Sequence, residues 1–158
     1  MNKISYVEGD ATEPIGDGRK VIAHITNNYG GWGRGFVLAL SAKWKQPEWC
    51  YRKYSSLKLG EVQLVPVGNR IIVANMCAQN GNWNGNPKTP ACNVKALEIC
   101  LKQVAAFCRD MECSLHTVRI GCGLGGEVWD NIEPLIESIV CEKGIDVYVY
   151  DFPKKEEN

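Results

Sequence analysis

Short apolar runs alternate with amphipathic segments along this chain. Residues 3–8 alternate apolar and polar positions before a Gly-Asp turn, which predicts a strand, and residues 20–25 form an apolar run that predicts a buried strand with a polar end. The stretch 36–44 predicts a helix that stops before Pro47, and the segment 47–56 predicts another short helix.

The middle of the chain predicts a hairpin followed by a loop. Strands are expected at 61–67 and 70–76, with a turn at Gly68-Asn69 between them. Residues 80–92 contain four Asn, two Gly and two Pro, which is typical of a loop.

The last third returns to the alternation of helices and strands. Val94, Leu97, Leu101 and Val104 recur at helical spacing, and Asn93 is the expected N-cap of their helix. We then expect a strand at 114–120, a helix at 130–144 and a final strand at 145–152. Asp130 and Glu133 could open the second helix as a capping box, with Pro134 near its first turn.

This alternation predicts the fold class α/β, as a three-layer α/β/α sandwich with a mixed, largely parallel central sheet. The hairpin supplies the antiparallel pairing. We expect one domain over residues 1–153 and a solvated tail at 154–158. Ligands of such sheets bind beyond the carboxyl ends of the strands, so loops that follow strand ends are the candidate binding loops.

Composition narrows the range of partners. The chain has 158 residues, and 18 basic side chains balance 18 acidic ones, so charge gives no strong nucleic-acid signal and no sign of an anionic membrane surface. No apolar run is long enough to span a bilayer, and the first ten residues lack the apolar core of a signal peptide. We therefore expect a cytoplasmic protein whose partners are small molecules or proteins.

Eight cysteines show neither a CxxC pair nor zinc-like spacing, so we predict no metal and no cofactor. Several lie inside apolar runs, where they are expected to act as small hydrophobes in a reducing compartment. Cys122 differs because it lies inside a glycine-rich loop.

Two glycine clusters follow predicted strands, RIGCGLGG (119–126) and NNYGGWGRGF (27–36). Bare backbone between a strand and a helix exposes N–H groups that bind phosphate, especially next to the positive end of the helix dipole. Neither the P-loop pattern nor GxGxxG is present in 119–126, and a tight turn that needs positive φ is the competing explanation. Both clusters should meet at one sheet edge, where they could grip a diphosphate from two sides.

Polar residues beside these loops are further candidates. Asn27 and Asn28 end a buried strand and suit either ribose hydroxyls or a turn. His24 lies within that strand, and His116 within another, where a histidine is more often part of the core than a catalyst. Asp10 follows the first strand, where it could accept from an exocyclic amine such as that of adenine or cap a turn.

The ordered set of motifs VEGDAT, IAHITNNYGGWGRGF, VANMCAQ, RIGCGLGG with Trp129, and VYVYDF resembles a macrodomain, the ADP-ribose-binding α/β/α fold. The resemblance covers nearly the whole chain. It is closest to the branch that includes terminal ADP-ribose glycohydrolase and the yeast-type ADP-ribose 1″-phosphate phosphatase.

The resemblance assigns a part of the ligand to each loop. Asp10 and the backbone of Ala11 would hold the adenine amine, with Tyr150 or Phe152 near the ring. The first glycine loop would surround the distal ribose, and the second would cradle the diphosphate. The substrate-binding residues it implies are Gly9, Asp10, Ala11, Asn27, Gly31, Trp32, Gly33, Arg34, Gly35, Gly121, Cys122, Gly123, Leu124, Gly125, Tyr150 and Phe152.

The resemblance also bears on catalysis. The glycohydrolase branch is expected to use a lysine nucleophile and an acid, but ANMCAQ has no lysine and Gly125 stands where the acid is expected, with Glu127 the nearest carboxylate. The phosphatase branch is expected to use a histidine that His24 matches, although its acidic partner has no counterpart in NMCAQNGNWNG. His24 and Asn28 are therefore the implied catalytic residues.

Three functions follow from these implications. The first is a hydrolase acting on ADP-ribose 1″-phosphate or on an ADP-ribosylated substrate, which His24 favours. The second is a module that binds ADP-ribose, or an ADP-ribosylated protein, without turnover, which the missing carboxylates favour. The third is a binder of another nucleotide with a similar fold.

Overall fold

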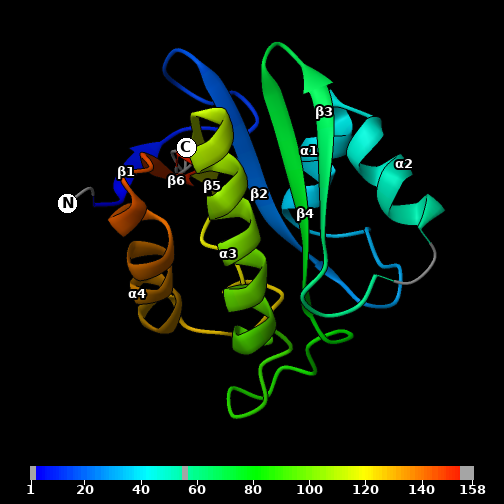
Figure 1. Cartoon of the computed structure of the whole chain (residues 1–158). Coiled ribbons are helices and arrows are strands. Elements are labelled where there is room, and N and C mark those ends of the chain that lie inside the picture. The colour runs from blue at the N-terminus through cyan, green and yellow to red at the C-terminus, as the bar shows by residue number, and fades with distance from the viewer. Residues whose placement is uncertain (1–2, 55–56, 154–158) are drawn as a thin grey trace, which may run out of the picture.

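The computed structural model describes residues 3–54 and 57–153. Its elements are β1 (Ser5–Glu8), β2 (Arg19–Asn27), α1 (Phe36–Lys43), α2 (Gln46–Lys53), β3 (Val62–Gly68), β4 (Ile71–Gln79), α3 (Val94–Met111), β5 (Cys113–Thr117), α4 (Trp129–Ile139), the 3₁₀ turn η1 (Cys141–Lys143) and β6 (Val147–Asp151) (Figure 1). The last two residues of the helix expected at 47–56 and the tail expected at 154–158 lie outside the described residues.

The six strands form one sheet in the order β1-β6-β5-β2-β4-β3. Every neighbouring pair is parallel except β3 and β4, which form the antiparallel hairpin. Helices α3 and α4 cover one face of the sheet and α1 and α2 the other (Figure 1). The predicted three-layer α/β/α sandwich with a mixed, largely parallel sheet is confirmed.

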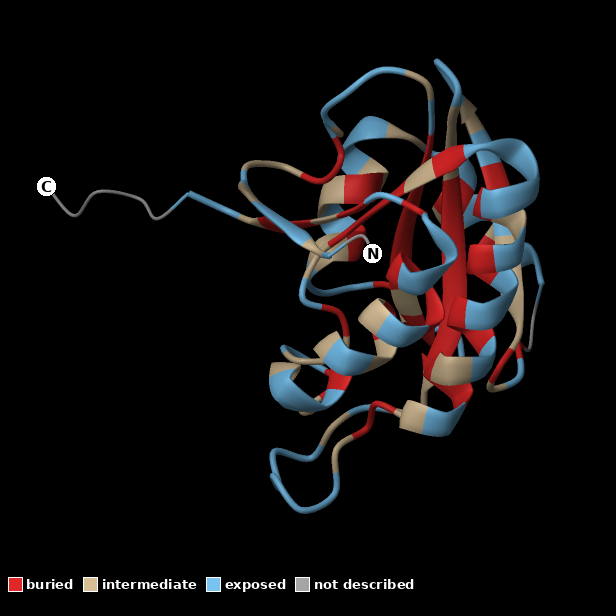
Figure 2. Ribbon diagram, turned by 60° about the vertical axis from the view of Figure 1, so that its left-hand side comes forward, coloured by how far each residue is buried: buried red, intermediate tan, exposed pale blue. Residues whose placement is uncertain are grey.

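Strand β2 lies in the middle of the sheet and is buried on both faces. Val21 and Ala23 pack in the core beneath α3 and α4, while Ile22 packs with Val37 and Leu40 of α1. Because both faces of β2 are covered, its sequence reads as a continuous apolar run rather than an alternating one. The central strands are accordingly the most buried part of the chain, between helices that are exposed on their outer sides (Figure 2).

The parallel strands place their carboxyl ends at one edge of the sheet. The segments that leave this edge are residues 9–18, 28–35, 80–93, 118–128 and 152–153. Both glycine clusters are among them, so the topology brings together the loops that the sequence proposes for binding.

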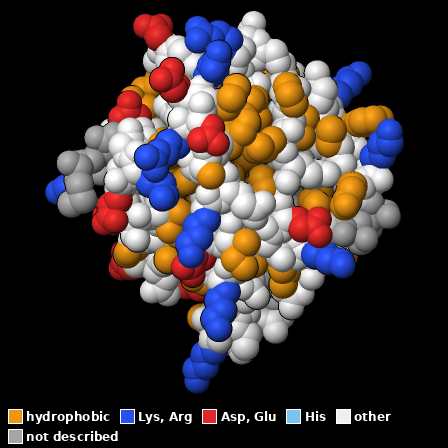
Figure 3. All heavy atoms as spheres, in the orientation of Figure 1, with side chains coloured by type: hydrophobic (Ala, Val, Ile, Leu, Met, Phe, Trp, Pro, Cys, Tyr) orange, Lys and Arg blue, Asp and Glu red, His pale blue; other side chains and the backbone are white. Residues whose placement is uncertain are grey.

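The outer surface carries mixed charge. Acidic and basic side chains are interspersed over the face that carries α3 and α4 (Figure 3). None of the helices in the described part of the chain is long and apolar enough to cross a membrane.

All eight cysteines are free thiols in this structure, and six of them are buried. Burial raises the pKa of Cys100 and of Cys108 to about 12, which keeps both thiols protonated at neutral pH. These cysteines act as small core side chains, as predicted from their apolar surroundings.

The start of α4 differs from the prediction. The helix begins at Trp129, and its N-cap Val128 makes no side-chain capping bond, so the capping box of Asp130 and Glu133 is wrong. Glu127 replaces it, because its Oε1 accepts from the backbone N–H of Val128 and from Asn131 Nδ2. The earlier start also places Pro134 inside the helix rather than in its first turn.

Candidate functional site

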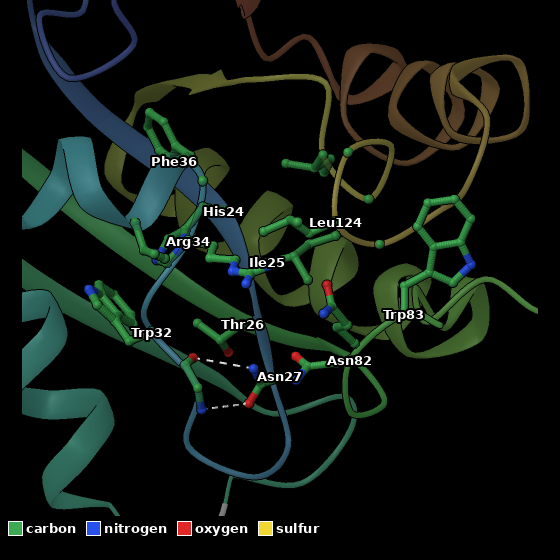
Figure 4. Close-up of a pocket in the computed structure, with 18 of the residues that line it drawn as sticks. His24, Ile25, Thr26, Asn27, Trp32, Arg34, Phe36, Asn82, Trp83 and Leu124 are labelled. Atoms are coloured by element: carbon green, nitrogen blue, oxygen red, sulfur yellow. Dashed lines mark hydrogen bonds between the residues drawn. The ribbon is translucent and has the colours of Figure 1, made fainter. Parts of the chain in front are cut away.

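A cavity of about 730 Å³ lies at the carboxyl edge of the sheet, between the two glycine loops (Figure 4). Its volume is in the range of small-molecule binding sites. The end of β2, the start of α1, the first part of the loop after β4 and the segment after β5 line it. The lining residues are His24, Ile25, Thr26, Asn27, Tyr29, Gly31, Trp32, Gly33, Arg34, Gly35, Phe36, Val37, Gln79, Asn82, Trp83, Val118, Arg119, Ile120, Gly121, Gly123, Leu124 and Gly125.

Asn27 shapes the first glycine loop. Its Oδ1 accepts from the backbone N–H groups of Tyr29 (3.2 Å) and Gly31 (3.0 Å) and from the Tyr51 hydroxyl (2.7 Å). Its Nδ2 donates to the Gly31 carbonyl, so both ends of the amide hold the same residue (Figure 4). Asn27 therefore acts as a turn former and lines the cavity at the same time.

The second glycine loop is tight where it packs on the protein. Gly121 has φ +77°, and a Cβ there would lie 2.7 Å from Cys92 Sγ and 2.9 Å from Ile132 Cδ1. Gly126 has φ +74°, and the ring of Trp83 packs against its backbone, so there is no room for a side chain. At these two positions the fold itself requires glycine.

Gly123 has no such requirement. It is exposed, its φ is not positive, and a Cβ there would meet no atom within 4 Å. It also lines the cavity. Packing and backbone conformation therefore do not require glycine here, and the bare backbone leaves room for close approach of a ligand.

The two glycine loops meet, as predicted from their places after neighbouring strands. A Cβ on Gly35 would lie 3.3 Å from Leu124 Cδ1, so the loops are in side-chain contact. Gly35 is also the N-cap of α1, whose first turn contains no acidic residue. The positive end of the α1 dipole therefore opens into the cavity beside the second loop.

The charged side chains that line the cavity are two arginines. Arg34 and Arg119 line it, and its lining contains no Asp, Glu or Lys side chain. Arg119 is held by a two-pronged ion pair with Asp151, with Nε 2.8 Å from Oδ1 and the NH2 group 3.0 Å from Oδ2, and its guanidinium stacks over Trp129. Asp151 therefore neutralises much of the charge of Arg119, and Arg34 is the other cationic side chain of the lining.

His24 lies on β2 directly opposite Asn75 of β4, and its Nε2 is 2.5 Å from Asn75 Oδ1. The ring is 2% exposed and packs edge-on against Trp32. Burial lowers the pKa of His24 to about 4, so the imidazole is neutral at pH 7. Its Nδ1 is buried and has no hydrogen-bond partner among the described residues. His24 thus belongs both to the core and to the cavity lining.

Asn28 does not line the cavity. Its Nδ2 donates to Asn80 Oδ1 (2.9 Å), and its Oδ1 accepts from the backbone N–H of Gly81 (3.0 Å). The side chain ties the first glycine loop to the segment after β4. A catalytic role for Asn28 stays a prediction, and it would require this amide to exchange partners.

The residues that the resemblance assigns to adenine lie beside the cavity lining, at the ends of β1 and β6. Asp10 Oδ1 accepts from the backbone N–H and the hydroxyl of Thr12, as in the turn-capping alternative. The Tyr150 hydroxyl accepts from the backbone N–H of Ile15 and bonds to His116 Nδ1. Phe152 is 59% exposed. Gly9 and Ala11 flank Asp10, and none of these residues lines the cavity.

Cys122 is the remaining predicted residue outside the lining. Burial raises its pKa, so the thiol is a weak nucleophile at neutral pH. Within the lining, sequence reasoning missed Arg119 and the residues Gln79, Asn82 and Trp83. Gln79 ends β4, and Asn82 and Trp83 lie in the 80–92 loop that follows it, so the position of this loop directly after a strand of the same sheet is the signal that could have found them.

Comparison with known proteins places the chain in a family, although no family model matches it. The chain is similar to a macrodomain protein from Streptomyces coelicolor, at 42% identity over 94% of this chain and 99% of that one, with a TM-score of 0.83. A protein of unknown function from Bacteroides thetaiotaomicron is 47% identical over 95% and 98% of the two chains, with a TM-score of 0.91.

Two further similarities involve longer or more distant proteins. The chain is 31% identical to mouse Chromodomain-helicase-DNA-binding protein 1-like over 163 residues, which cover 96% of this chain and 18% of the mouse protein. Thermosipho africanus DarTG, solved in complex with ADP-ribose, is 18% identical to this chain with a TM-score of 0.74. The match covers 100% of this chain and 43% of the DarTG chain, and at this identity it shows the fold alone.

The fold and the cavity define an α/β/α protein with a cavity at the carboxyl edge of its sheet. Because the Streptomyces protein is 42% identical over nearly the whole of both chains, this chain belongs to the macrodomain family.

A glycine that the fold requires can be distinguished from one that it does not require by the effect of substitution on stability. Gly123→Ala should leave the free energy of unfolding within about 0.5 kcal/mol of the wild type, because the new Cβ meets open space. Gly121→Ala should lower it by roughly 2–4 kcal/mol through left-handed strain and overpacking against Cys92. Urea denaturation of both variants measures this, and equal losses would contradict the distinction.

Stability should fall as the pH drops from about 6.5 to 4. Burial lowers the pKa of His24 and of His116 to about 4, from 6.5 in the unfolded chain. Between these values the unfolded state binds more protons, so each histidine costs on the order of 3 kcal/mol of stability by pH 4 and nothing above 6.5. Denaturation curves at pH 5 and 7 test this. His24→Gln should show a clearly smaller pH dependence than the wild type, and an equally steep one would contradict the contribution of His24.

Proposed function

We propose that this protein binds ADP-ribose in the cavity between its glycine loops. The observation that carries the proposal is the lining itself, which combines Arg34, Arg119 and the bare backbone at Gly123 with no carboxylate. A diphosphate is the ligand group that needs both cations and close backbone approach. Membership in the macrodomain family and the ADP-ribose complex of Thermosipho DarTG support this ligand.

The geometry suggests how the ligand would lie. The diphosphate would lie against the backbone of Gly123 and the start of α1, within reach of Arg34. The distal ribose would lie toward Asn27 and His24, at the end of β2. The adenine would extend past Arg119, toward the ends of β1 and β6.

At the adenine end, Asp10 and Phe152 are the suitable side chains. Both hydrogen bonds from Thr12 go to Asp10 Oδ1, which leaves Oδ2 to accept from the exocyclic amine. The exposed ring of Phe152 offers a stacking surface. Tyr150 is buried and its hydroxyl is engaged by the segment 9–18, so it would support this end rather than contact the base.

A second candidate function is hydrolysis of ADP-ribose 1″-phosphate. His24 favours it, because this residue lines the cavity at the end where the distal ribose would lie. The lining without carboxylates favours binding without turnover, since no acidic side chain stands ready to assist a leaving group.

Calorimetry with ADP-ribose tests the binding proposal. We expect a dissociation constant in the micromolar range or below, and Gly123→Val should abolish most of this affinity because its side chain would occupy the phosphate position. Asp10→Ala should weaken binding by roughly 1–3 kcal/mol through the lost hydrogen bond to the amine.

Gly144→Ala is the matched control for these variants. Gly144 has φ +79°, so its substitution strains the backbone and controls for lost stability; because Gly144 follows η1 and does not line the cavity, the affinity should stay unchanged. Normal binding by a folded Gly123→Val protein would show that this loop is only a turn. An unchanged dissociation constant in Asp10→Ala would remove the adenine assignment.

Phosphate release from ADP-ribose 1″-phosphate tests the second candidate. If the protein is a phosphatase, His24→Ala should lose about 10²–10⁴-fold in rate, the usual contribution of a general acid or base. Its affinity for ADP-ribose should change only a few-fold. Retained activity in a folded His24→Ala protein excludes the catalytic role, and a wild type that releases no phosphate and cleaves no ADP-ribosyl linkage is a binding module.

A further inference from the structure

The plane of the Arg119 guanidinium is fixed at the edge of the cavity. Arg119 follows β5 and lines the cavity. Its Nε lies 2.8 Å from Asp151 Oδ1, and its Nη2 lies 3.0 Å from Asp151 Oδ2, at the end of β6. A pair of parallel hydrogen bonds of this kind fixes the plane of a guanidinium as well as its position. The orientation of this flat group is therefore set before any ligand binds.

Aromatic rings cover only one side of this guanidinium. Its Cζ lies 5.0 Å from the centroid of the Tyr6 ring and 5.4 Å from that of the Trp129 six-membered system. Rings on opposite faces would have their centroids about 10 Å apart, but these two centroids are 6.5 Å apart. The rings therefore do not sandwich Arg119, and one flat face has no ring against it. Although the side chain is ion-paired, it is 42% exposed.

The two rings are themselves held in place. Trp129 Nε1 donates to the Tyr6 hydroxyl at 2.9 Å and to Glu133 Oε2 at 3.2 Å. The Tyr6 hydroxyl donates to the same Glu133 carboxylate. Tyr6 belongs to β1, while Trp129 and Glu133 belong to α4. This network gives the guanidinium a firm support on the side that the rings cover.

The shape of Arg119 distinguishes it more than its charge. Asp151 neutralises much of that charge, and a guanidinium is more weakly hydrated than an ammonium group and stacks on aromatic faces. Nucleobases are among the rings that stack on guanidinium planes. Arg34 also lines the cavity, and it makes no ion pair in the described part of the chain. Arg34 is therefore the cation available to a phosphate, and Arg119 is the flat surface available to a base.

We infer that Arg119 is a base-stacking residue, whose free guanidinium face supports the adenine ring of ADP-ribose. This inference rests on the proposed function, which leads the adenine past Arg119 toward the ends of β1 and β6. The partners of Arg119 come from these same two strands, Tyr6 from β1 and Asp151 from β6. At this position the ligand recognises the plane of the side chain rather than its charge.

Arg119→Lys separates the plane from the charge, because lysine keeps a cation beside Asp151 and has no flat face. We expect ADP-ribose to bind about three- to thirtyfold more weakly to this variant, the usual range for a lost contact between a cation and an aromatic ring. The inhibition constant of inorganic pyrophosphate should not change, because pyrophosphate has no base. Calorimetry, with pyrophosphate as a competitor, measures both.

Arg109→Lys is the matched control. Arg109 is exposed in the last turn of α3 and does not line the cavity, so the same exchange there should leave both affinities unchanged.

The wild type gives a second, spectroscopic measurement. In ¹H–¹⁵N spectra the Nε–H of Arg119, which is hydrogen-bonded to Asp151, reports on what covers the guanidinium. An adenine ring over its face shifts this proton upfield through its ring current, whereas a new phosphate contact does not. We expect an upfield shift with ADP-ribose and none with pyrophosphate. Side-chain correlations in the wild type assign the signal.

The outcomes are separable. A folded Arg119→Lys protein that binds ADP-ribose as tightly as the wild type overturns the inference, and so does an equal loss of affinity for pyrophosphate, which would identify a phosphate contact. If the variant does not fold, the wild-type spectrum decides, and a proton that does not move upfield overturns the inference. A wild type that does not bind ADP-ribose refutes the proposed function together with this inference, whereas binding without these stacking signals refutes the inference alone.

Discussion

The central position of β2 is the constraint on which the rest of the structure depends. Because β2 pairs in parallel with both β5 and β4, its side chains alternate between two cores, and its carboxyl end opens at the middle of the binding edge. His24 and Asn27 are therefore placed by the same pairing that builds the core. A shift of one residue in this register would turn His24 away from Asn75 and exchange the side chains of β2 between the two cores, where they would not fit their neighbours.

The fold was largely predictable because its signals are local. Hydrophobic alternation gave the order of strands and helices, and the N-cap at Asn93 is confirmed by the bond from Ala96 N to its side chain. The meeting of the glycine loops followed from strand order alone. The capping box failed because Glu127, just outside the expected motif, competes for the same end of α4.

The site was only partly predictable because its decisive contacts join distant segments. The ion pair that holds Arg119 joins residues 32 positions apart, and the bond between His24 and Asn75 spans 51 positions. No spacing rule in a single sequence reveals such pairs. The sequence alone also does not distinguish Gly121 from Gly123. Only the structure shows that Cys92 packs behind Gly121 and that the space beside Gly123 is open.

The two buried histidines differ in how many of their ring nitrogens have hydrogen-bond partners, and this difference decides how burial affects each ring. In His116 both ring nitrogens have partners, Ser114 at Nε2 and Tyr150 at Nδ1, so burial makes it a structural link between β5 and β6. In His24 only one nitrogen has a partner. An unpaired polar atom in a core is costly, so Nδ1 of His24 lowers the stability of the folded protein, whereas the fully bonded ring of His116 does not carry this cost.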